Sequence, residues 1–287
     1  MVTSVGATGA QNVIKALRAQ RKYAVDLIGC DASPDNAGAY LVDQFHIIPM
    51  GGEPHFVTHL ASLCQELQVD MLLPIMEDEI LAIARHRDIF QRYFPVISDL
   101  RSIALCADKA ATNELVTGIG VKCPRTFKDL SAATGSIVIK PRSGTGSNGI
   151  RFFDTPPMQE IAQLGDESVI QEFVKGQEYT VDCYVGIDKE FIACSPRKRL
   201  AVKGGLATKT LVVDHPTLVA TSKRILEAIP IRGACNIQFI ENESGECFFI
   251  EINPRFGGAY IASIEAGLNA PLFMLNEFYG DDIEFDG

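Results

Sequence analysis

Asn236-Ile237-Gln238-Phe239-Ile240 and Phe248-Phe249-Ile250-Glu251-Ile252-Asn253-Pro254-Arg255 are two nearby runs in which polar and apolar residues largely alternate. A period of two is typical of β-strands, whose successive side chains point to opposite faces. The polar connection 241–246 contains a glycine, so the two runs are predicted to form an antiparallel hairpin. On the second strand we expect one face to carry Phe248, Ile250 and Ile252 and the other to carry Phe249, Glu251 and Asn253.

The register of this hairpin decides which polar side chains meet. A two-residue turn at Ser244-Gly245 pairs Gln238 with Glu251 and Asn236 with Asn253. A four-residue loop shifts the pairing by two and keeps every face, whereas an odd loop or a bulge would change the faces. In either even register Gln238, Glu251 and Asn253 point the same way from strands about 5 Å apart.

Carboxylate and carboxamide oxygens gathered in this way indicate a site for a hard divalent cation, Mg²⁺ or Mn²⁺. The alternative is a hairpin whose solvent-facing side happens to be polar. Apolar residues on both sides of Glu251 favour an interior strand, where an unpaired carboxylate is costly. Pro254 then ends the strand, and Arg255 supplies a planar fork of donors suited to phosphate. The segment therefore predicts a metal site that binds an anionic substrate.

The composition indicates a globular protein with a small-molecule partner. At 287 residues and 47% hydrophobic, the chain can bury a sizeable core and form two or three subdomains. No apolar run approaches the roughly 18 residues of a membrane span, and the first residues lack the features of a signal peptide. A net charge of -10 argues against a nucleic-acid partner, because phosphate backbones attract basic surfaces.

The cysteines point to a reducing compartment. They are scattered without a C-x-x-C pair and mostly lie among apolar residues, at Cys30, Cys64, Cys106, Cys123, Cys183, Cys194, Cys235 and Cys247. This distribution is typical of buried, reduced thiols and predicts a cytoplasmic protein, with metal or disulfide roles less favoured.

The first third of the chain is predicted to form a parallel sheet. Strands at Val2–Val5, Tyr23–Cys30 and Asp70–Pro74 alternate with helices at Asn12–Gln20 and Pro54–Leu67. The first strand ends in Gly6-Ala7-Thr8-Gly9, and Asp31 follows about twenty residues later, but the dinucleotide pattern G-x-G-x-x-G is incomplete. A structural turn or a small-anion site is therefore favoured over NAD binding.

Glu77-Asp78-Glu79 follows the third of these strands and has two interpretations. It lies where the carboxyl ends of parallel strands bind ligands. Acidic residues are equally typical of the first turn of a helix. The sequence does not decide between a ligand site and a helix start.

A glycine-rich loop separates two strands in the middle of the chain. A helix at Leu105–Ile119, carrying Asp108 and Lys109, precedes the strand Ser136–Lys140. Gly144-Thr145-Gly146-Ser147-Asn148-Gly149 then completes G-x-G-x-x-G, but it opens the strand Ile150–Phe153 rather than a helix, which excludes the dinucleotide fingerprint. Glycine leaves backbone N–H groups open to phosphate oxygens, so the loop is predicted to be a flap over nucleotide phosphates, with Lys140 on the α- or β-phosphate. A surface hairpin with a terminal lysine is the alternative.

The next segments complete the predicted nucleotide site. The strand Ser168–Val174 ends in an apolar connector whose backbone suits an adenine edge, and Glu178 is placed to accept from ribose hydroxyls. Two further strands are expected at 182–185 and 191–194. A basic segment, 195–209, follows them and is interpreted either as a solvated loop or as a mobile segment that holds an anionic substrate. The pattern of Pro216–Ile229 is helical, and another helix is expected after Tyr260.

The order of these motifs resembles the ATP-grasp superfamily, and most closely the stand-alone relatives of the carbamoyl-phosphate synthase large chain. The likeness extends over nearly the whole chain and implies an α/β protein, α+β in its ATP-grasp part. It implies an N-terminal Rossmann-like parallel-sheet domain at 1–100, a lid subdomain with the glycine flap at 101–175, and a C-terminal subdomain with the metal site at 176–287. The ATP-grasp part would have antiparallel sheets.

The resemblance also implies residue roles. The phosphate and nucleotide contacts would come from Lys109, Lys140, Gly144, Gly146, Ser147 and Gly149, adenine contacts from Glu172, Phe173 and Val174, and the ribose contact from Glu178. Gln238, Glu251 and Asn253 would bind Mg²⁺ or Mn²⁺, and Arg255 and Lys140 would act on the transferred phosphoryl. Two features depart from the family: Gln238 replaces a more common acid, and the spacing from Gly176 to Glu178 is one residue shorter than in the synthase.

The implied reaction is ATP-dependent activation of a carboxylate, or bicarbonate, as an acylphosphate that an amine or ammonia then attacks. A single ATP-grasp unit favours a carboxylate–amine ligase over a carbamoyl-phosphate synthase, which joins two such units. The other hypotheses are a split synthase with a second subunit, a phosphotransferase acting on a hydroxyl, a non-catalytic ATP-binding module and an NAD oxidoreductase. A homo-oligomer is also compatible with the sequence, and the acceptor is expected near Glu77.

Overall fold

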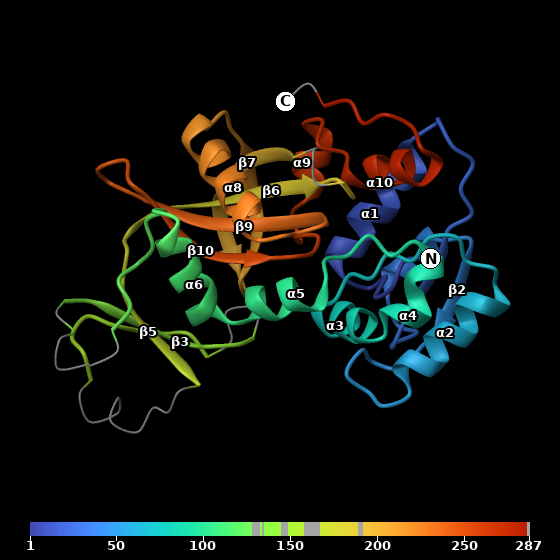
Figure 1. Cartoon of the computed structure of the whole chain (residues 1–287), viewed down its shortest axis with the longest axis horizontal. Helices are drawn as coiled ribbons and strands as arrows, with labels where there is room; N and C mark the ends of the chain where they lie inside the picture. The colour runs from blue at the N-terminus through green and yellow to red at the C-terminus, as the bar shows by residue number, and fades with distance from the viewer. Residues whose placement is uncertain (128–132, 134, 145–148, 158–166, 189–191, 286–287) are drawn as a thin grey trace.

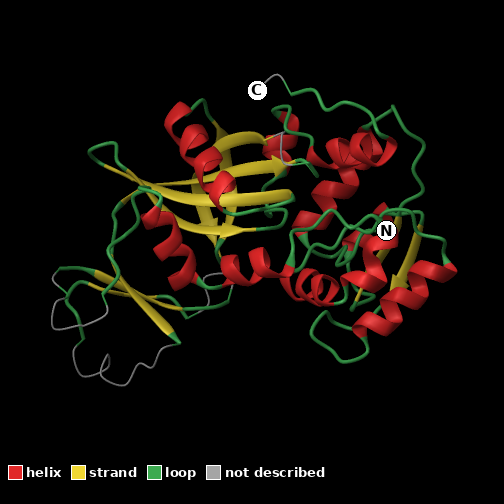
Figure 2. Cartoon of the chain, in the orientation of Figure 1, coloured by secondary structure: helices red, strands yellow, loops and turns green. Residues whose placement is uncertain are grey.

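A computed structural model of the chain describes residues 1–127, 133, 135–144, 149–157, 167–188 and 192–285. Within these residues the fold is α/β, with three separate sheets of two, three and five strands. Helices flank the sheets in Figure 1 and Figure 2. No helix of the described part is long and apolar enough to cross a membrane. The mixed fold class predicted from the sequence is confirmed.

The N-terminal part has a parallel sheet, as predicted, but with shorter strands. The two strands β1 (Ile28–Asp31) and β2 (Gln44–Ile47) pair in parallel, and single bridges join Val2 to Gly29 and to Leu73. The segments 2–5 and 70–74 therefore lie in the sheet through isolated bridges rather than as full strands, and β2 was not predicted. The helices of this part are α1 (Thr8–Ala19), η1 (Ala37–Leu41), α2 (Phe56–Glu66), α3 (Glu77–Arg85), α4 (Arg87–Phe90) and η2 (Gln91–Tyr93).

The helix predicted at Leu105–Ile119 is wrong in its bounds, because the helical conformation is interrupted at Asp108. Two helices, α5 (Leu100–Ala107) and α6 (Lys109–Gly118), meet there. The Asp108 carboxylate caps α6 by accepting from the backbone N–H groups of Ala110 and Ala111, at 3.0 and 3.1 Å. A short polar side chain that competes for backbone donors favours such a cap over the interior of a helix.

The three-stranded antiparallel sheet carries the predicted glycine loop. Its central strand β3 (Ile137–Pro141) pairs with β4 (Arg151–Phe153) on one side and with β5 (Ser168–Glu172) on the other. A small apolar cluster that includes Ile137 and Ile170 packs against it. The loop from β3 to β4 is described up to Gly144 and again from Gly149, so Gly146 and Ser147 lie outside the described residues.

The five-stranded antiparallel sheet is the centre of the C-terminal part. Its order is β10-β9-β6-β7-β8, with strands β6 (Gly176–Val185), β7 (Ile192–Lys203), β8 (Leu206–Val212), β9 (Gly233–Asn242) and β10 (Cys247–Asn253). The basic segment 195–209, predicted to be a loop, forms the hairpin β7–β8, closed by Gly204 and Gly205 with φ of 57° and 76°. Helices α8 (Pro216–Ala228), α9 (Ile261–Glu265) and α10 (Ala270–Tyr279) complete the chain.

The hairpin β9–β10 has an odd loop and a bulge that compensate each other. Asn242 donates to Glu246 across the three-residue loop 243–245, which shifts the pairing by one. The bulge between Phe249 and Glu251 shifts it back, so that Glu251 pairs with Gln238. The expected pairing of the polar residues therefore results from two irregularities instead of a regular strand.

The bulge also corrects the predicted faces of β10. Phe249 and Ile252, each 1% exposed, lie together in the core, although they were expected on opposite faces. Ile250 is the bulged residue and lines a cavity on the other side with Glu251 and Asn253. The apolar face of the large sheet is covered by α8, whose Leu218 and Ile225 are fully buried.

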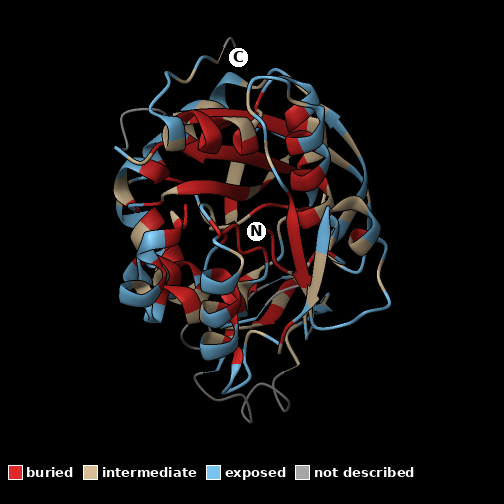
Figure 3. Ribbon diagram, turned by 90° about the vertical axis from the view of Figure 1, so that its right-hand side faces the viewer, coloured by how far each residue is buried: buried red, intermediate tan, exposed pale blue. Residues whose placement is uncertain are grey.

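Buried residues follow the strands and the inner faces of the helices, and exposed residues lie outside them (Figure 3). Cys106 of α5 and Val116 of α6 share one apolar cluster with the large sheet, and Phe273 of α10 packs in a cluster with Ile14 of α1. The first helix, α1, and the last helix, α10, thus pack in the same hydrophobic core. The domain boundaries near 100 and 175 stay predictions.

Candidate functional site

A cavity of about 510 Å³ lies between the three-stranded sheet and the large sheet. Its walls come from β3, β5, β6, β7, β9 and β10, from the start of α6 and from the loop 255–259. Twelve of the predicted site residues lie in the described part of the chain. All of them except Gly149 line the cavity: Lys109, Lys140, Gly144, Glu172, Phe173, Val174, Glu178, Gln238, Glu251, Asn253 and Arg255.

The strand register places the polar residues of the cavity in two rows across the large sheet. The first row runs through Glu251 of β10, Gln238 of β9, Thr180 of β6 and Arg197 of β7. The second, adjacent row runs through Asn253, Asn236, Asp182 and Ser195. Because side chains alternate along each strand, both rows lie on the same face of the sheet, opposite the apolar core.

The three candidate metal ligands converge on one carboxylate oxygen. Glu251 Oε1 accepts from Gln238 Nε2 at 2.8 Å and from Asn253 Nδ2 at 3.1 Å. Asn253 Nδ2 also donates to Asn236 Oδ1 at 3.2 Å. A half-turn of either carboxamide exchanges its nitrogen and oxygen, so both can offer an oxygen beside Glu251 to a hard cation. This donor set fits Mg²⁺.

Lys140 is a buried cation on the wall of the same cavity. It is only 6% exposed, and its ammonium has no hydrogen-bond partner among the described residues. Burial lowers the pKa of Lys140 to about 8; the Glu251 carboxylate raises it and the Lys109 ammonium lowers it. A buried charge without a partner is costly, so the position suits an anionic ligand.

Lys109 and Asp108 hold the start of the glycine loop against α6. Lys109 Nζ donates to the Gly144 carbonyl at 2.6 Å, and its backbone N–H donates to the Arg142 carbonyl at 3.0 Å. Arg142 in turn donates to both Asp108 oxygens, at 2.9 and 2.7 Å, which lowers the pKa of Asp108. The loop therefore begins from a fixed point beside the cavity.

The residues expected near adenine and ribose also line the cavity, but both carboxylates have partners. Glu172 Oε1 accepts from the Arg125 backbone N–H at 3.0 Å. Phe173 packs edge-to-face on Phe152, with ring centroids 5.4 Å apart, and both rings are substantially exposed. Glu178 forms an ion pair with Arg199 at 3.1 Å, so a ribose would have to share its carboxylate with that guanidinium.

Arg255 connects the hairpin β9–β10 to the N-terminal part. Its Nε donates to Glu77 Oε1 at 2.7 Å, and Nη1 donates to the Phe256 carbonyl at 3.3 Å. Glu77 begins α3, which confirms the helix-start interpretation of the acidic triplet, while the ligand-site interpretation stays a prediction. Asn12 of α1 also reaches this region by donating to the Gly258 carbonyl at 3.0 Å.

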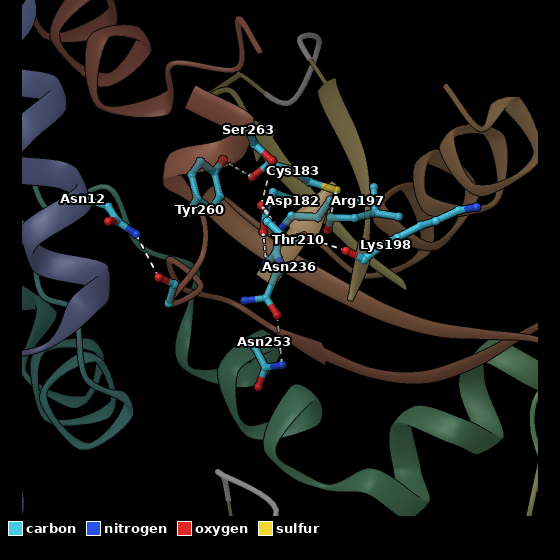
Figure 4. A network of polar contacts seen from close by, with 12 residues as sticks. Asn12, Asp182, Cys183, Arg197, Lys198, Thr210, Asn236, Asn253, Tyr260 and Ser263 are labelled. Carbon is cyan, nitrogen blue, oxygen red and sulfur yellow. Dashed lines mark hydrogen bonds and ion pairs between the residues drawn. The ribbon is translucent and has the colours of Figure 1, made fainter. Parts of the chain in front are cut away.

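Sequence reasoning missed a buried network beside the cavity (Figure 4). Arg197 Nε and Nη2 donate to the two oxygens of Asp182, at 2.7 and 3.3 Å, and Ser263 Oγ donates to Asp182 Oδ2 at 2.7 Å. The side chains of Arg197 and Asp182 are 3% and 0% exposed. A signal existed in the alternation of polar residues from Glu178 to Asp182, but the basic segment was not recognised as the partner strand.

A second group of possible metal ligands does not suit a metal. His215, Glu241 and Cys247 have ligand atoms within 4.8 Å of one another. However, His215 Nδ1 accepts from the Leu218 backbone N–H at 3.3 Å, so the neutral ring carries its proton on Nε2, which faces Glu241 at 3.4 Å. The imidazole is therefore the cap of α8.

The predicted burial of the thiols agrees with the structure. All eight cysteines are free; six are buried, and Cys123 and Cys247 are partly buried. Burial raises the pKa of the Cys123 and Cys247 thiols, which makes them poor nucleophiles. None of the eight lines the cavity.

Comparison with known proteins gives two family matches along the chain. Residues 1–96 match the PylC-like N-terminal domain, and residues 106–259, more than half of the chain, match the ATP-grasp domain. A curated relative, the carbamoyl-phosphate synthase of Methanobrevibacter smithii, is 21% identical over 281 residues, which cover 89% of this chain and 75% of the relative.

Two solved structures illustrate the similarity of the fold. The biotin carboxylase domain of the 2-oxoglutarate carboxylase of Hydrogenobacter thermophilus, solved with MgADP, ADP and bicarbonate, has a TM-score of 0.78 at 14% identity, covering 99% of this chain and 70% of that chain. The L-amino acid ligase of Bacillus licheniformis has a TM-score of 0.72 at 13% identity, covering 96% and 73%. With its family match and the order of its motifs, the chain belongs to the ATP-grasp domain family.

Proposed function

We propose that the protein is an ATP-dependent ligase that activates a carboxylate, or bicarbonate, as an acylphosphate for attack by an amine or ammonia. The observation that carries this proposal is the convergence of Gln238, Glu251 and Asn253 on one carboxylate oxygen, in the same cavity as the buried Lys140. The volume of about 510 Å³ is in the usual range for small-molecule sites.

The comparisons support this function and its cofactor. The L-amino acid ligase and the carbamoyl-phosphate synthase belong to the reaction class proposed here, and the biotin carboxylase domain was solved with MgADP and bicarbonate. Magnesium is therefore the favoured cation. Manganese prefers similar oxygen ligands and is the second choice.

In this proposal the residues of the chain act mainly by charge and position. Bound Mg²⁺ would supply charge neutralisation at the β- and γ-phosphates, with Gln238, Glu251 and Asn253 as its ligands. Lys140 and Lys109 lie where they can neutralise phosphate oxygens, and Arg255 can hold the transferred phosphoryl. Glu77 fixes the Arg255 guanidinium for that task.

The chemistry needs no nucleophilic side chain. A carboxylate oxygen of the acceptor bonds to the γ-phosphorus as the bond to the β–γ bridging oxygen breaks and ADP leaves. The amine nitrogen then bonds to the acyl carbon, the carbon–oxygen bond to phosphate breaks, and the amine loses a proton to solvent. Exclusion of water from the cavity would protect the acylphosphate from hydrolysis.

The experiment is a panel of acids and amines assayed for release of ADP and phosphate. Hydroxylamine serves as a general amine because it converts an acylphosphate to a stable hydroxamate. Acid-dependent hydroxamate with ADP supports the ligase. ADP formed with a hydroxyl acceptor would instead indicate a phosphotransferase, and ATP binding without turnover across the panel would indicate a regulatory module.

Carbamoyl-phosphate synthesis is the second candidate function. Its specific support is the curated carbamoyl-phosphate synthase. This chain covers 75% of that relative, so the relative is much shorter than a chain with two ATP-grasp units. The same panel separates the two functions: ADP that depends on bicarbonate and ammonia favours the synthase. A second subunit or a homo-oligomer, and a cytoplasmic location, stay proposals; the Hydrogenobacter domain is a dimer.

The affinity for ATP should fall as the pH rises through about 8. Lys140 binds phosphate as the ammonium, and burial has lowered its pKa to about 8. At one pH unit above that value only about a tenth of the lysine is protonated, so the Kd for MgATP should increase about tenfold between pH 7 and pH 9. Isothermal titration calorimetry across this range measures the change.

The control for this experiment is Lys140→Gln. This variant should bind MgATP more weakly at neutral pH, and its Kd should stay nearly constant from pH 7 to pH 9. An equally steep pH dependence in Lys140→Gln would assign the titration to another group.

A further inference from the structure

Three buried polar atoms of cavity-lining residues have no hydrogen-bond partner within the described part of the chain: Thr180 Oγ1, Arg197 Nη1 and Arg199 Nε. Arg199 Nε still lies 3.1 Å from a Glu178 oxygen in an ion pair. Thr180 and Arg197 are direct cross-strand neighbours. An unpaired buried donor is destabilising, so the Thr180 hydroxyl and Arg197 Nη1, side by side, indicate a ligand that completes their bonding.

The rest of the Arg197 guanidinium is fixed in place. Nε and Nη2 both donate to Asp182, which also accepts from Ser263. The head group therefore cannot turn to satisfy Nη1 without breaking a buried ion pair. Nη1 is left as a single, positioned donor.

Two residues without side chains, Gly257 and Gly258, form part of the cavity wall near the Arg197 guanidinium. A Cβ at Gly257 would lie 3.4 Å from Arg197 Nη2, and a Cβ at Gly258 would lie 3.1 Å from the side chain of Leu206. Both glycines line the cavity. Leu206 is 52% exposed, close to the tip of the hairpin β7–β8, so a modest movement of this side chain would open the wall.

Arg197 is displaced from the candidate metal ligands along the same row of the sheet. Thr180 is the direct neighbour of Gln238, and Arg197 is two strands from Gln238, a separation of roughly 10 Å between backbones. A carboxylate that receives the γ-phosphoryl has to lie close to the phosphorus, within about 3.5 Å. A group that reaches Arg197 as well as Thr180 is therefore a different part of the acceptor from the reacting carboxylate.

We propose that Thr180 and Arg197 hold a second carboxylate of the acceptor, which makes the substrate a dicarboxylic acid. This inference rests on the proposed ligase function, which it deepens. Asp182 already neutralises the arginine, so the site offers two hydrogen bonds and little net charge. That balance suits a singly charged carboxylate better than a doubly charged phosphate.

The test compares a dicarboxylic acid series, from malonate to adipate, with monocarboxylic acids and monoamides of the same length. In the wild type the best dicarboxylate should exceed its matched monoamide at least tenfold in kcat/KM for hydroxamate formation, an advantage of about 1.4 kcal/mol. Direct binding of the same acids to the whole protein is measured by calorimetry.

Thr180→Val is the main variant because it keeps the shape of the side chain and removes an unpaired hydroxyl. It should raise the KM for the dicarboxylate about tenfold, leave the Kd for MgATP and the rate with monocarboxylates within twofold, and leave the melting temperature unchanged or higher. Arg197→Lys, which keeps a charge beside Asp182, should shift the KM in the same direction.

Thr210→Val is the matched control. The Thr210 hydroxyl lies on the same sheet but donates to the Lys198 carbonyl at 2.7 Å and does not line the cavity, so the preference for dicarboxylates should persist. If ADP forms with an acid but the wild type does not prefer a dicarboxylate, or Thr180→Val leaves the dicarboxylate KM unchanged, this inference is overturned and the ligase is kept. If a dicarboxylate binds and Thr180→Val weakens that binding, but no acid gives ADP, the carboxylate site is supported and the ligase function is overturned.

Discussion

Replacing Glu251 with alanine should reduce metal-dependent ATP turnover by roughly 10³-fold or more, because the variant loses the only carboxylate among the three candidate metal ligands. Gln238 and Asn253 would remain, but two neutral carboxamides are weak ligands for Mg²⁺ without an acid. The fold should survive. Glu251 is partly buried and its loss leaves the Gln238 carboxamide without this acceptor, which costs about 1–3 kcal/mol, whereas Asn253 keeps its hydrogen bond to Asn236.

The measurement combines steady-state phosphate release with a magnesium titration and thermal unfolding. Glu251→Gln should show the same loss of turnover with less loss of stability, since its amide oxygen can still accept from Gln238 and Asn253. Glu243→Gln is the matched control, because Glu243 is an exposed acid at the turn of the same hairpin. Wild-type turnover in Glu251→Ala would refute the metal assignment.

The candidate metal site could be predicted from the sequence because its residues lie on two adjacent strands. The alternation of polar and apolar residues predicted which face of its strand Gln238 lies on, and a tight turn suggested its pairing with Glu251. The path of β10 could not be predicted. The three-residue loop shifts the register by one and the bulge at Ile250 shifts it back, so Glu251 has the expected partner, but Phe249 lies on a different face from the expected one. Local patterns do not reveal two irregularities that compensate each other.

The row that ends at Arg197 was not predictable for a different reason. Arg197 and Lys198 are charged residues in a segment with two glycines, and such a composition is typical of a solvated loop. In the structure the Arg197 side chain is 3% exposed because Asp182, fifteen residues earlier, neutralises it. Charge pairing across strands overrides composition, and it becomes visible only once the strands are paired.

The N-terminal part shows the effect of tertiary contacts on weak strands. Val2 and Leu73 were expected within full strands, but they take part only in isolated parallel bridges, from Val2 to Gly29 and from Val2 to Leu73. The topology was still predictable, since apolar segments alternate with helices throughout this part. Glu77 was expected at the edge of the sheet and near the acceptor, but its ion pair with Arg255, 178 residues away, was not predicted, because it depends on tertiary packing.

Asp182 should be among the most important residues for stability, although it is not a predicted ligand of substrate or metal. Its carboxylate is 0% exposed and accepts from Arg197 and Ser263. Removing one partner of a buried ion pair leaves an uncompensated charge, at a cost of about 3–5 kcal/mol. Since domains are stable by about 5–15 kcal/mol, Asp182→Ala should unfold at a much lower urea concentration than the wild type.

Three comparison variants separate the charge from its hydrogen bonds. Ser263→Ala removes one hydrogen bond to Asp182 and should cost about 1–2 kcal/mol. Asp182→Asn keeps the shape but not the charge and should approach the cost of Asp182→Ala. The double variant Asp182→Leu with Arg197→Met removes both charges and should recover much of the lost stability, because apolar residues of similar volume can replace a buried pair at little cost. If Asp182→Ala lowers the free energy of unfolding by less than about 1 kcal/mol, water reaches Arg197 in its place, and the guanidinium is not held in the dry position that the acceptor site requires.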